Sequence, residues 1–353
     1  MAFKSKGINA LSAFIILAVA CMAVQGGPAW GAGGVFSLLE VDHMSEQLPE
    51  LAKPFVGGIS VRYSWKLIEP RPGEYNWTPL DKAIQLAQSK GKQVMIRVVA
   101  GALSPEWLAQ AGAQWAPSHP PDPALLSRLS GQGKLPPQRL KILEMIKKTP
   151  VPWDPVYLKH WSALIQAFGR RYDGNPAIFS VQMTGGGVAG EMTLLGELFD
   201  WQRYGYSDAK MIETWKTIID AYRQSFPRTP TNLDILEPLR GMSKVVVPVV
   251  KYCLTRYPGQ VYIQNNGLNA KGAWGRPIIR AAASKTRVGY QMSGGGGWIA
   301  ATVGSRSQAF QIAIEDGASY LEVYRGDLTN PAEDEAMKNL AKGLAQNERK
   351  QPR

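Results

Sequence analysis

Residues 56–100 read VGGISVRYSWKLIEPRPGEYNWTPLDKAIQLAQSKGKQVMIRVVA and contain one complete structural unit. Two runs that are almost entirely apolar or β-branched, 56–65 and 93–100, predict strands covered on both faces, as in a parallel sheet. Between them, the apolar residues of 80–92 recur at helical spacing and predict an amphipathic helix. The stretch therefore predicts a strand, a crossover helix and a second, parallel strand.

The same unit recurs along the chain. Further strands are predicted at 34–41, 177–185, 229–236, 260–267, 286–294 and 318–324, and further amphipathic helices at 155–174, 209–226 and 331–346. Strand and helix alternating eight times over roughly 320 residues predict an α/β fold, a single (β/α)8 TIM barrel. The segment from about 109 to 155 is rich in proline, glycine and serine, and predicts a long loop insertion after the third strand.

The composition is that of a globular protein. Of 353 residues, 45% are hydrophobic and 19% are charged, which is enough apolar material for a full core. The net charge is +12, but the lysines and arginines are dispersed and form no basic block. We therefore expect a solvated basic surface and no nucleic-acid site, with adhesion to an anionic polymer of the cell envelope as an alternative.

The N-terminus has the three-part plan of a secretory signal peptide. Lys4 and Lys6 precede the uncharged stretch 8–25, and the small residues of 26–34 follow. We expect cleavage after Gly31, export to the periplasm or the medium, and a mature barrel of residues 32–353 without a stable membrane span. A retained N-terminal anchor is the alternative. Cleavage would leave Cys253 as the only cysteine, so no intrachain disulfide is expected.

Metal and cofactor motifs are missing from the sequence. His43, His119 and His160 are scattered, and no HExxH, Cys/His cluster, GxSxG or phosphate-binding loop occurs. We therefore expect no metal and no cofactor, and look for the chemistry in carboxylates at the carboxyl ends of the strands, where barrel enzymes carry their catalytic groups.

Two glutamates qualify as candidate catalytic residues. Glu191 follows the fourth strand on the glycine-rich loop TGGGVAGE, at 184–191. Glu322 lies within the eighth strand, where alternation places Tyr320, Glu322 and Tyr324 on one face. A carboxylate at such a position needs a partner or a function; the alternative is a structural ion pair with Arg62 or Arg97.

Two carboxylates over an aromatic-lined cleft are the requirement for glycoside hydrolysis, because one protonates the leaving oxygen and the other attacks or stabilises the sugar cation. Aromatic faces also suit the apolar face of a sugar ring. The sequence thus predicts a carbohydrate substrate. The candidate substrate-binding residues are Arg62, Trp65, Trp107, Gln291, Trp298 and Tyr324. For Trp65, packing in the core is an equal alternative, and Arg62 is a candidate to orient a carboxylate.

The run from 61 to 98 resembles the second-to-third-strand region of the clan A (β/α)8 glycoside hydrolases, the cellulase-like and β-galactosidase-like barrels. It matches the pattern R-x-x-W-x-x-x-E-P-x-x-G-x-Y-x-W, and SPEWL at 104–108 resembles their P-x-W-L. The resemblance covers about 50 residues and implies a retaining glycosidase, with an acid/base glutamate after the fourth strand and a nucleophilic glutamate at the end of the seventh. It also implies that Glu69 is a structural partner.

The sequence departs from that pattern at both catalytic positions. Glu191 follows a glycine-rich loop in place of the usual Asn-Glu, and Gln291 stands where the nucleophile is expected. Three interpretations follow: Glu322 replaces the missing carboxylate, which we prefer; Asp234 or Glu237 replaces it; or the site binds sugar without cleaving it. We therefore predict an exported glycoside hydrolase that uses Glu191 and Glu322, with a non-catalytic carbohydrate-binding barrel as the alternative.

Overall fold

The computed structural model of the protein describes residues 34–45, 47–119, 146–196, 198–236, 238–239, 244–295 and 304–351. The signal peptide predicted at 1–31 lies outside the described residues, as do Glu237 and Trp298.

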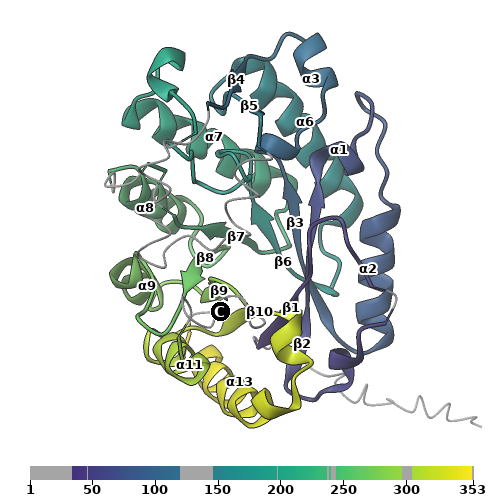
Figure 1. Cartoon of the computed structure of the whole chain (residues 1–353), viewed down its shortest axis with the longest axis vertical. Helices are drawn as coiled ribbons and strands as arrows, with labels where there is room; N and C mark the ends of the chain where they lie inside the picture. The colour runs from purple at the N-terminus through teal and green to yellow at the C-terminus, as the bar shows by residue number, and fades with distance from the viewer. Residues whose placement is uncertain are drawn as a thin grey trace, which may run out of the picture. The chain divides into compact units, whose positions relative to one another are not determined.

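Eight parallel strands close into a barrel in which neighbours follow the order of the chain (Figure 1). The strands are β1 (Val35–Leu38), β2 (Val56–Ser64), β3 (Gln93–Val99), β6 (Ile178–Met183), β7 (Thr231–Asp234), β8 (Val261–Leu268), β9 (Val288–Met292) and β10 (Tyr320–Tyr324). The last strand pairs with the first, so that Leu321 lies opposite Val35. The expected single (β/α)8 barrel is confirmed, and each predicted strand is present with ends that differ by a few residues.

Helices follow the strands along the chain. They are α1 (Trp65–Ile68), α2 (Thr78–Ser89), α3 (Trp107–Gln110), α6 (Pro155–Tyr172), α7 (Asp208–Ser225), α8 (Val246–Arg256), α9 (Arg276–Ala282), α11 (Arg306–Glu315), α12 (Arg325–Leu328) and α13 (Asp334–Glu348). Short 3₁₀ turns are η1 (Pro49–Ala52), η2 (Gly101–Leu103), η3 (Trp201–Tyr204) and η4 (Pro331–Glu333). The four predicted helices correspond to α2, α6, α7 and α13, and Figure 1 shows α11 and α13 side by side.

Local sequence explains where the longer helices begin. The Asp154 carboxylate accepts a hydrogen bond from the Tyr157 backbone N–H at 2.8 Å, and Pro155 occupies the first helical turn of α6. At α7, the Ser207 hydroxyl accepts from the Lys210 N–H at 3.2 Å. Such caps satisfy N–H groups that have no partner within the helix, so each helix begins at a defined residue.

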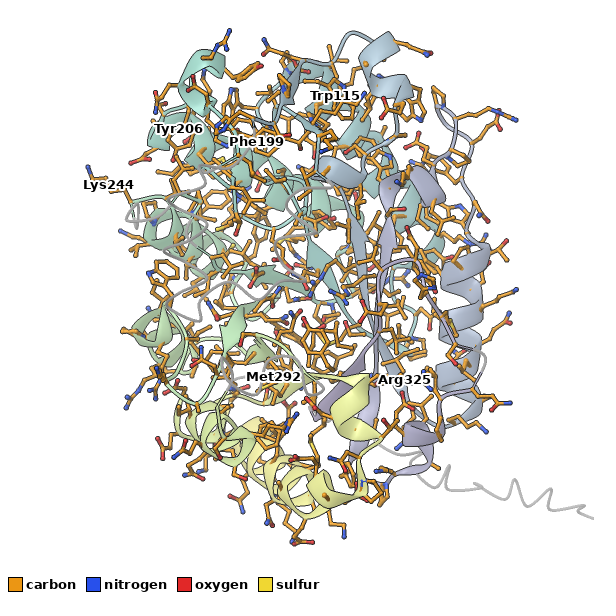
Figure 2. All side chains as sticks on the ribbon, in the orientation of Figure 1. Trp115, Phe199, Tyr206, Lys244, Met292 and Arg325 are labelled. Atoms are coloured by element: carbon orange, nitrogen blue, oxygen red, sulfur yellow. The ribbon has the colours of Figure 1, made fainter. Side chains whose placement is uncertain are left out.

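The region predicted as an insertion contains additional elements. Between β3 and α6, β4 (Trp115–Pro117) and β5 (Lys148–Pro150) form an antiparallel pair in which Ala116 lies opposite Thr149. Figure 2 labels Trp115 in this small sheet. Residues 120–145 of the predicted insertion lie outside the described part of the chain.

The barrel has two separate apolar cores. The larger one lies between strands and helices and includes the fully buried Trp161 and Trp215. The smaller one, which we call the apolar layer, consists of Phe36, Met95, Phe179, Tyr262 and Tyr320. These five residues come from β1, β3, β6, β8 and β10, and side chains of non-adjacent strands in a closed barrel meet only across its interior. The apolar layer therefore fills part of the barrel interior, with the Phe36 and Phe179 ring centroids 4.8 Å apart.

Two further findings concern the sequence predictions. Within the described ranges, no helix has both the length and the apolar character to cross a membrane. Cys253 in α8 is buried and unpaired.

Candidate active site

A polar layer lies next to the apolar layer inside the barrel. Three polar side chains each follow a member of the apolar layer by two residues in the same strand: Arg97 after Met95, Gln264 after Tyr262, and Glu322 after Tyr320. Because alternate residues of a strand share a face, these side chains enter the interior one step closer to the carboxyl ends of the strands. All three are at least 97% buried, with exposed fractions of 3%, 0% and 0%.

Arg97 joins the two predicted catalytic glutamates. Its Nη1 donates to Glu191 Oε1 at 2.8 Å, and its Nη2 donates to Glu322 Oε2 at 3.3 Å. Nη2 also lies 3.2 Å from the Gln291 amide oxygen. The structure thus brings Glu191, Glu322 and Gln291 together around one guanidinium, from elements far apart in the sequence.

Glu322 is enclosed by its partners. Its Oε1 accepts from the Ser60 hydroxyl, and its Oε2 accepts from Gln264 Nε2 at 2.5 Å as well as from Arg97. With an exposed fraction of 0%, this carboxylate offers no free oxygen to a sugar. Its position does not agree with the expectation that Glu322 attacks or stabilises the anomeric carbon; it agrees with the alternative of a buried ion pair with Arg97.

Glu191 is placed at the mouth by a compact glycine loop. The Gly185 N–H donates to the Gly190 carbonyl at 2.7 Å, and both glycines have positive φ, 112° and 85°. At Gly187, a Cβ would lie 1.8 Å from the carbonyl oxygen of Glu191, so only glycine fits. The fold of the loop therefore depends on the glycines that precede the glutamate.

The Glu191 carboxylate has one fixed oxygen and one free oxygen. Oε1 accepts from Arg97 and, at 2.7 Å, from Asn266 Nδ2, whereas Oε2 accepts no hydrogen bond from any described residue. The side chain is 16% exposed, in contrast to the 0% of Glu322. Glu191 is therefore the accessible member of the pair.

Asn266 and Gln264, both on β8, close the network. Gln264 Nε2 donates to Asn266 Oδ1 at 2.6 Å as well as to Glu322. Arg97, Glu191, Asn266, Gln264 and Glu322 thus form a ring of hydrogen bonds, and we call these five residues the polar ring. Each member holds its neighbours at a defined angle, so the carboxylate of Glu191 is held in a single orientation.

Asp234, at the end of β7, lies beside the polar ring. Its Oδ1 accepts from the Asn266 backbone N–H at 3.0 Å, and its buried Oδ2 has no hydrogen-bond partner among the described residues. Burial, together with the negative charge of Glu191, raises the pKa of Asp234 well above its ordinary value, and the positive charge of Arg97 only partly opposes this. A second carboxyl group, more readily protonated than an ordinary aspartate, thus adjoins Glu191.

The structure places Trp65 in the core, in agreement with the packing alternative stated for it. Its exposed fraction is 0%, and its ring packs against Trp107, Tyr157 and Trp161. Its Nε1 donates to Glu69 Oε2 at 2.7 Å, while Glu69 Oε1 accepts from the Gly73 N–H. Glu69 is a structural partner of Trp65 and of the following turn, as expected.

Trp107 and Gln291 occupy intermediate positions. Trp107 is partly buried against the core, and its Nε1 donates to the Glu69 carbonyl at 3.1 Å. Gln291 lies opposite Glu322 in the pairing of β9 with β10 and is 6% exposed. Gln291 therefore places an amide, where the resemblance implies a carboxylate, beside the polar ring at the end of the seventh barrel strand. Roles for either residue in substrate binding stay predictions.

Arg62 does not hold either glutamate of the polar ring. Its Nε and Nη2 donate to the Leu39 carbonyl at 2.9 and 2.7 Å, and Nη2 lies 3.9 Å from the exposed carboxylate of Glu40. Burial, and then the positive charge of Arg97, lower the pKa of Arg62. Arg97, and not Arg62, donates to the two glutamates, and the predicted role of Arg62 in substrate binding stays a prediction.

Tyr324 lines a cavity at the carboxyl ends of β1 and β10. The cavity has a volume of about 270 Å³, and its wall includes Glu40, His43 and Arg325, the last labelled in Figure 2. Glu191 and Glu322 are not part of the wall. The predicted role of Tyr324 in substrate binding stays a prediction, as does that of Trp298, which lies outside the described residues.

Sequence reasoning missed part of the polar ring. Gln264 and Asn266 were not singled out, although three consecutive polar residues, QNN at 264–266, within an otherwise apolar strand are an available signal. Arg97 was considered only as a possible partner of Glu322. In the ranges that the structure covers, no group of three or more histidine, cysteine or acidic residues is arranged to hold a metal ion.

A family model described as "Beta-galactosidase" matches residues 46–120 of the sequence. This stretch spans β2, α2 and β3, including Arg97, and ends before Glu191. None of the curated proteins matches the sequence.

Two β-galactosidases and a xylanase are among the solved structures that share the fold. The β-galactosidase from Marinomonas ef1 is 11% identical with a TM-score of 0.53, and that from Halorubrum lacusprofundi is 10% identical with a TM-score of 0.55. Each similarity covers 88% of this chain but only 59% and 58% of the respective enzyme, so the chain spans less than two thirds of their length. Xylanase 10B from Thermotoga maritima is 12% identical with a TM-score of 0.53, over 89% of this chain and 96% of that one. At these identities the structures show the fold, and with the family model they confirm the resemblance to glycoside hydrolase barrels.

Proposed function

We propose that the protein is a glycoside hydrolase that cleaves an O-glycosidic bond of an oligo- or polysaccharide at the mouth of the barrel. The observation that carries this proposal is the Glu191 carboxylate, which has one oxygen fixed by Arg97 and Asn266 and the other free at the carboxyl ends of the strands. The match of residues 46–120 to the β-galactosidase family model supports a carbohydrate substrate and makes β-galactosides the first substrates to test.

Glu191 is the group that we assign to proton transfer. Hydrolysis breaks the bond between the anomeric carbon and the leaving oxygen, joins the oxygen of water to that carbon, and delivers a proton to the leaving oxygen. A carboxylate that exchanges this proton needs one oxygen within hydrogen-bond reach of the reacting atoms. Glu191 Oε2 meets this requirement because it accepts no hydrogen bond from any described residue.

For the second carboxyl group, burial does not separate the candidates, since Asp234 is 1% and Glu322 0% exposed. The contacts favour Asp234. Both oxygens of Glu322 are engaged, whereas Asp234 Oδ2 is unpartnered. Glu191 is paired with an arginine, whereas burial raises the pKa of Asp234. Enzymes that use two carboxyl groups separate the base from the acid by such unequal environments. We assign Glu322 to holding Arg97, and through Arg97 the orientation of Glu191.

A second candidate function is carbohydrate binding without cleavage. Gln291 at the end of β9 favours it, because an amide cannot serve as a nucleophile where the resemblance implies a glutamate. In that case oligosaccharide would bind at the mouth and remain intact.

We also propose that the protein acts outside the cytoplasm, in the periplasm or the medium. The support is the order of Lys4, Lys6, the uncharged stretch 8–25 and the small residues that follow. Sequencing the N-terminus of the protein recovered from each cell fraction tests this: a mature chain that begins at or near residue 32 supports it, and an intact N-terminus in the cytosol contradicts it.

Glu191→Gln tests the assigned activity. We expect the rate of nitrophenol release from aryl β-galactosides, and of reducing-end release from polysaccharides, to fall by about 10²–10⁴-fold. Glu74→Gln, at a glutamate that is 61% exposed on a surface turn, is the matched control and should keep the wild-type rate. Unchanged activity in Glu191→Gln would refute the assignment, and wild-type binding without product would favour the non-catalytic function.

A further inference from the structure

Trp274 differs from all the other tryptophans that the structure describes. Four of these are buried in the core and four pack against it: Trp65, Trp161, Trp201 and Trp215, then Trp77, Trp107, Trp115 and Trp153. Trp274 is 37% exposed and belongs to neither group. Among the described residues, the hydrogen bond at Trp274 is to its backbone carbonyl, and no aromatic ring or cationic side chain lies against its indole. Trp274 is therefore the most exposed of the described tryptophans.

The backbone of Trp274 is fixed at the mouth of the barrel. The residue lies in the short connection from β8 to α9, and connections that leave the carboxyl ends of the strands form the mouth of a (β/α)8 barrel. Asn265 Nδ2 donates to the Trp274 carbonyl at 2.9 Å and to the Ile235 carbonyl at 2.7 Å. One buried amide thus ties Trp274 to the residue that follows Asp234.

The same strand links Trp274 to Glu191. Asn265 and Asn266 are consecutive residues of β8, and their side chains bind the Trp274 loop and the Glu191 carboxylate respectively. The next residue, Gly275, has a φ of 79° and approaches Ile235, with Cδ1 3.3 Å from where a Cβ would lie. An exposed indole is therefore carried on a rigid support that shares β8 with the polar ring.

We propose that Trp274 is the platform of an additional sugar-binding subsite, on which one ring of an oligosaccharide stacks while the bond to be cleaved lies at Glu191. The proposal rests on the proposed function for its substrate class, because a carbohydrate presents an apolar face to an aromatic ring and hydroxyl groups to an indole N–H. A subsite on the β8–α9 connection favours substrates long enough to reach from Glu191 to Trp274. The protein thereby prefers oligosaccharides to the glycosides of single sugars.

Trp274→Ala and Trp274→Phe test the subsite in the full chain. The measurements are kcat/KM on an aryl β-galactoside of one sugar and on β-linked galacto- and xylo-oligosaccharides of two to six units. Calorimetry measures the binding of the same oligosaccharides to Glu191→Gln and to the double variant Glu191→Gln/Trp274→Ala. The affinities obtained in this way do not depend on turnover. Val247→Ala, at the other exposed large apolar side chain among the described residues, is the control.

For Trp274→Ala, we expect kcat/KM on the longest bound oligosaccharide and its affinity to fall about tenfold, since one stacked ring contributes on the order of one tenfold step. Activity on the one-sugar substrate should stay within twofold. Trp274→Phe should keep most of the affinity, and Val247→Ala all of it.

The two proposals fail in different ways. Suppose that the wild type cleaves glycosides. If Trp274→Ala then lowers kcat/KM equally for long and short substrates, or for neither, the subsite is refuted and the proposed function stands. If Trp274→Ala weakens oligosaccharide binding although the wild type cleaves nothing, the proposed function fails and the subsite stands. A wild-type dimer in sedimentation that Trp274→Ala converts to a monomer would show that the ring binds protein, and would also refute the subsite.

Discussion

On β3, β8 and β10, a member of the apolar layer and a member of the polar ring lie two residues apart, yet the two groups are built differently. Met95, Tyr262 and Tyr320 meet across the barrel by packing alone, while Arg97, Gln264 and Glu322, the next inward positions, meet by directed hydrogen bonds. Packing is non-directional, so the apolar layer tolerates changes of shape. The polar ring tolerates few changes, because each atom it loses leaves a buried charge or amide without a partner.

The difference leaves the one partly exposed carboxylate of the polar ring at one end of the barrel interior. The apolar layer excludes water from below Glu322 and Arg97, which strengthens their interaction. Above them, Glu191 is the member of the polar ring with a partly exposed carboxylate. The two groups therefore differ in role, since the apolar layer supports and insulates while the polar ring orients the Glu191 carboxylate.

The largest expected effect comes from removing the shared cation of the polar ring. Arg97→Ala leaves the Glu322 carboxylate fully buried without a positive partner, and we expect a loss of about 3–5 kcal/mol in the free energy of unfolding. Urea denaturation measures it. Arg71→Ala removes an arginine that is 75% exposed and paired with Glu74, and as the matched control should cost less than about 1 kcal/mol. Equal losses in the two variants would contradict the structural role assigned to Arg97.

A smaller effect is expected in the apolar layer. Phe179 is 3% exposed and contacts the rings of Phe36, Tyr262 and Tyr320. Phe179→Leu keeps an apolar side chain but leaves a small cavity, and should lower the free energy of unfolding by about 1–2 kcal/mol. The rate constant kcat, measured well below the melting temperature, should stay within twofold of wild type. A large fall in kcat without unfolding would show that the two layers are not independent.

Asp234 offers a test that depends on pH. An aspartate whose pKa is raised on folding holds its proton more tightly in the folded state, so its ionisation disfavours folding as the pH rises above the ordinary value of about 3.9. Asp234→Asn removes the ionisable group, and with it the loss of stability that its ionisation causes. We expect the melting temperature of the variant, relative to wild type, to increase from pH 4 to pH 8.

The control for this comparison is Asp200→Asn, at an exposed aspartate outside the polar ring, measured over the same range of pH. If Asp234→Asn gives a difference that does not change with pH, Asp234 is ionised in the folded protein at neutral pH, and its assignment as the more readily protonated carboxyl group is wrong.

The smallest effect is expected where an ion pair faces solvent. Glu40 is 76% exposed and lies 3.9 Å from Arg62, so Glu40→Gln should change the free energy of unfolding by less than about 1 kcal/mol. The small change should shrink further in high salt. A loss comparable to that of Arg97→Ala would mean that the rim of the barrel is as tightly coupled as the polar ring.

Much of the fold was predictable because its signals are local. Runs of apolar and β-branched residues identified all eight barrel strands, and helical spacing identified α2, α6, α7 and α13. The alternation of Tyr320, Glu322 and Tyr324 placed Glu322 on the inner face, and the glycines before Glu191 marked a loop at the mouth. These inferences need only neighbouring residues, since strand and helix periods are properties of a few consecutive positions.

The contacts of the site were decided by tertiary structure. Whether Arg62 or Arg97 reaches Glu322, whether Trp65 is core or surface, and whether an oxygen of Glu322 is free all depend on how β2, β3, β8 and β10 are staggered around the closed barrel. The period of a strand predicts which face a side chain takes. It does not predict which of two inward arginines, each more than 200 residues from Glu322 in the sequence, lies within hydrogen-bond distance of that glutamate. The sequence alone thus determined the barrel and the level of the candidate carboxylates near its mouth, while the closure of the sheet determined that both oxygens of Glu322 are engaged and one oxygen of Glu191 is free.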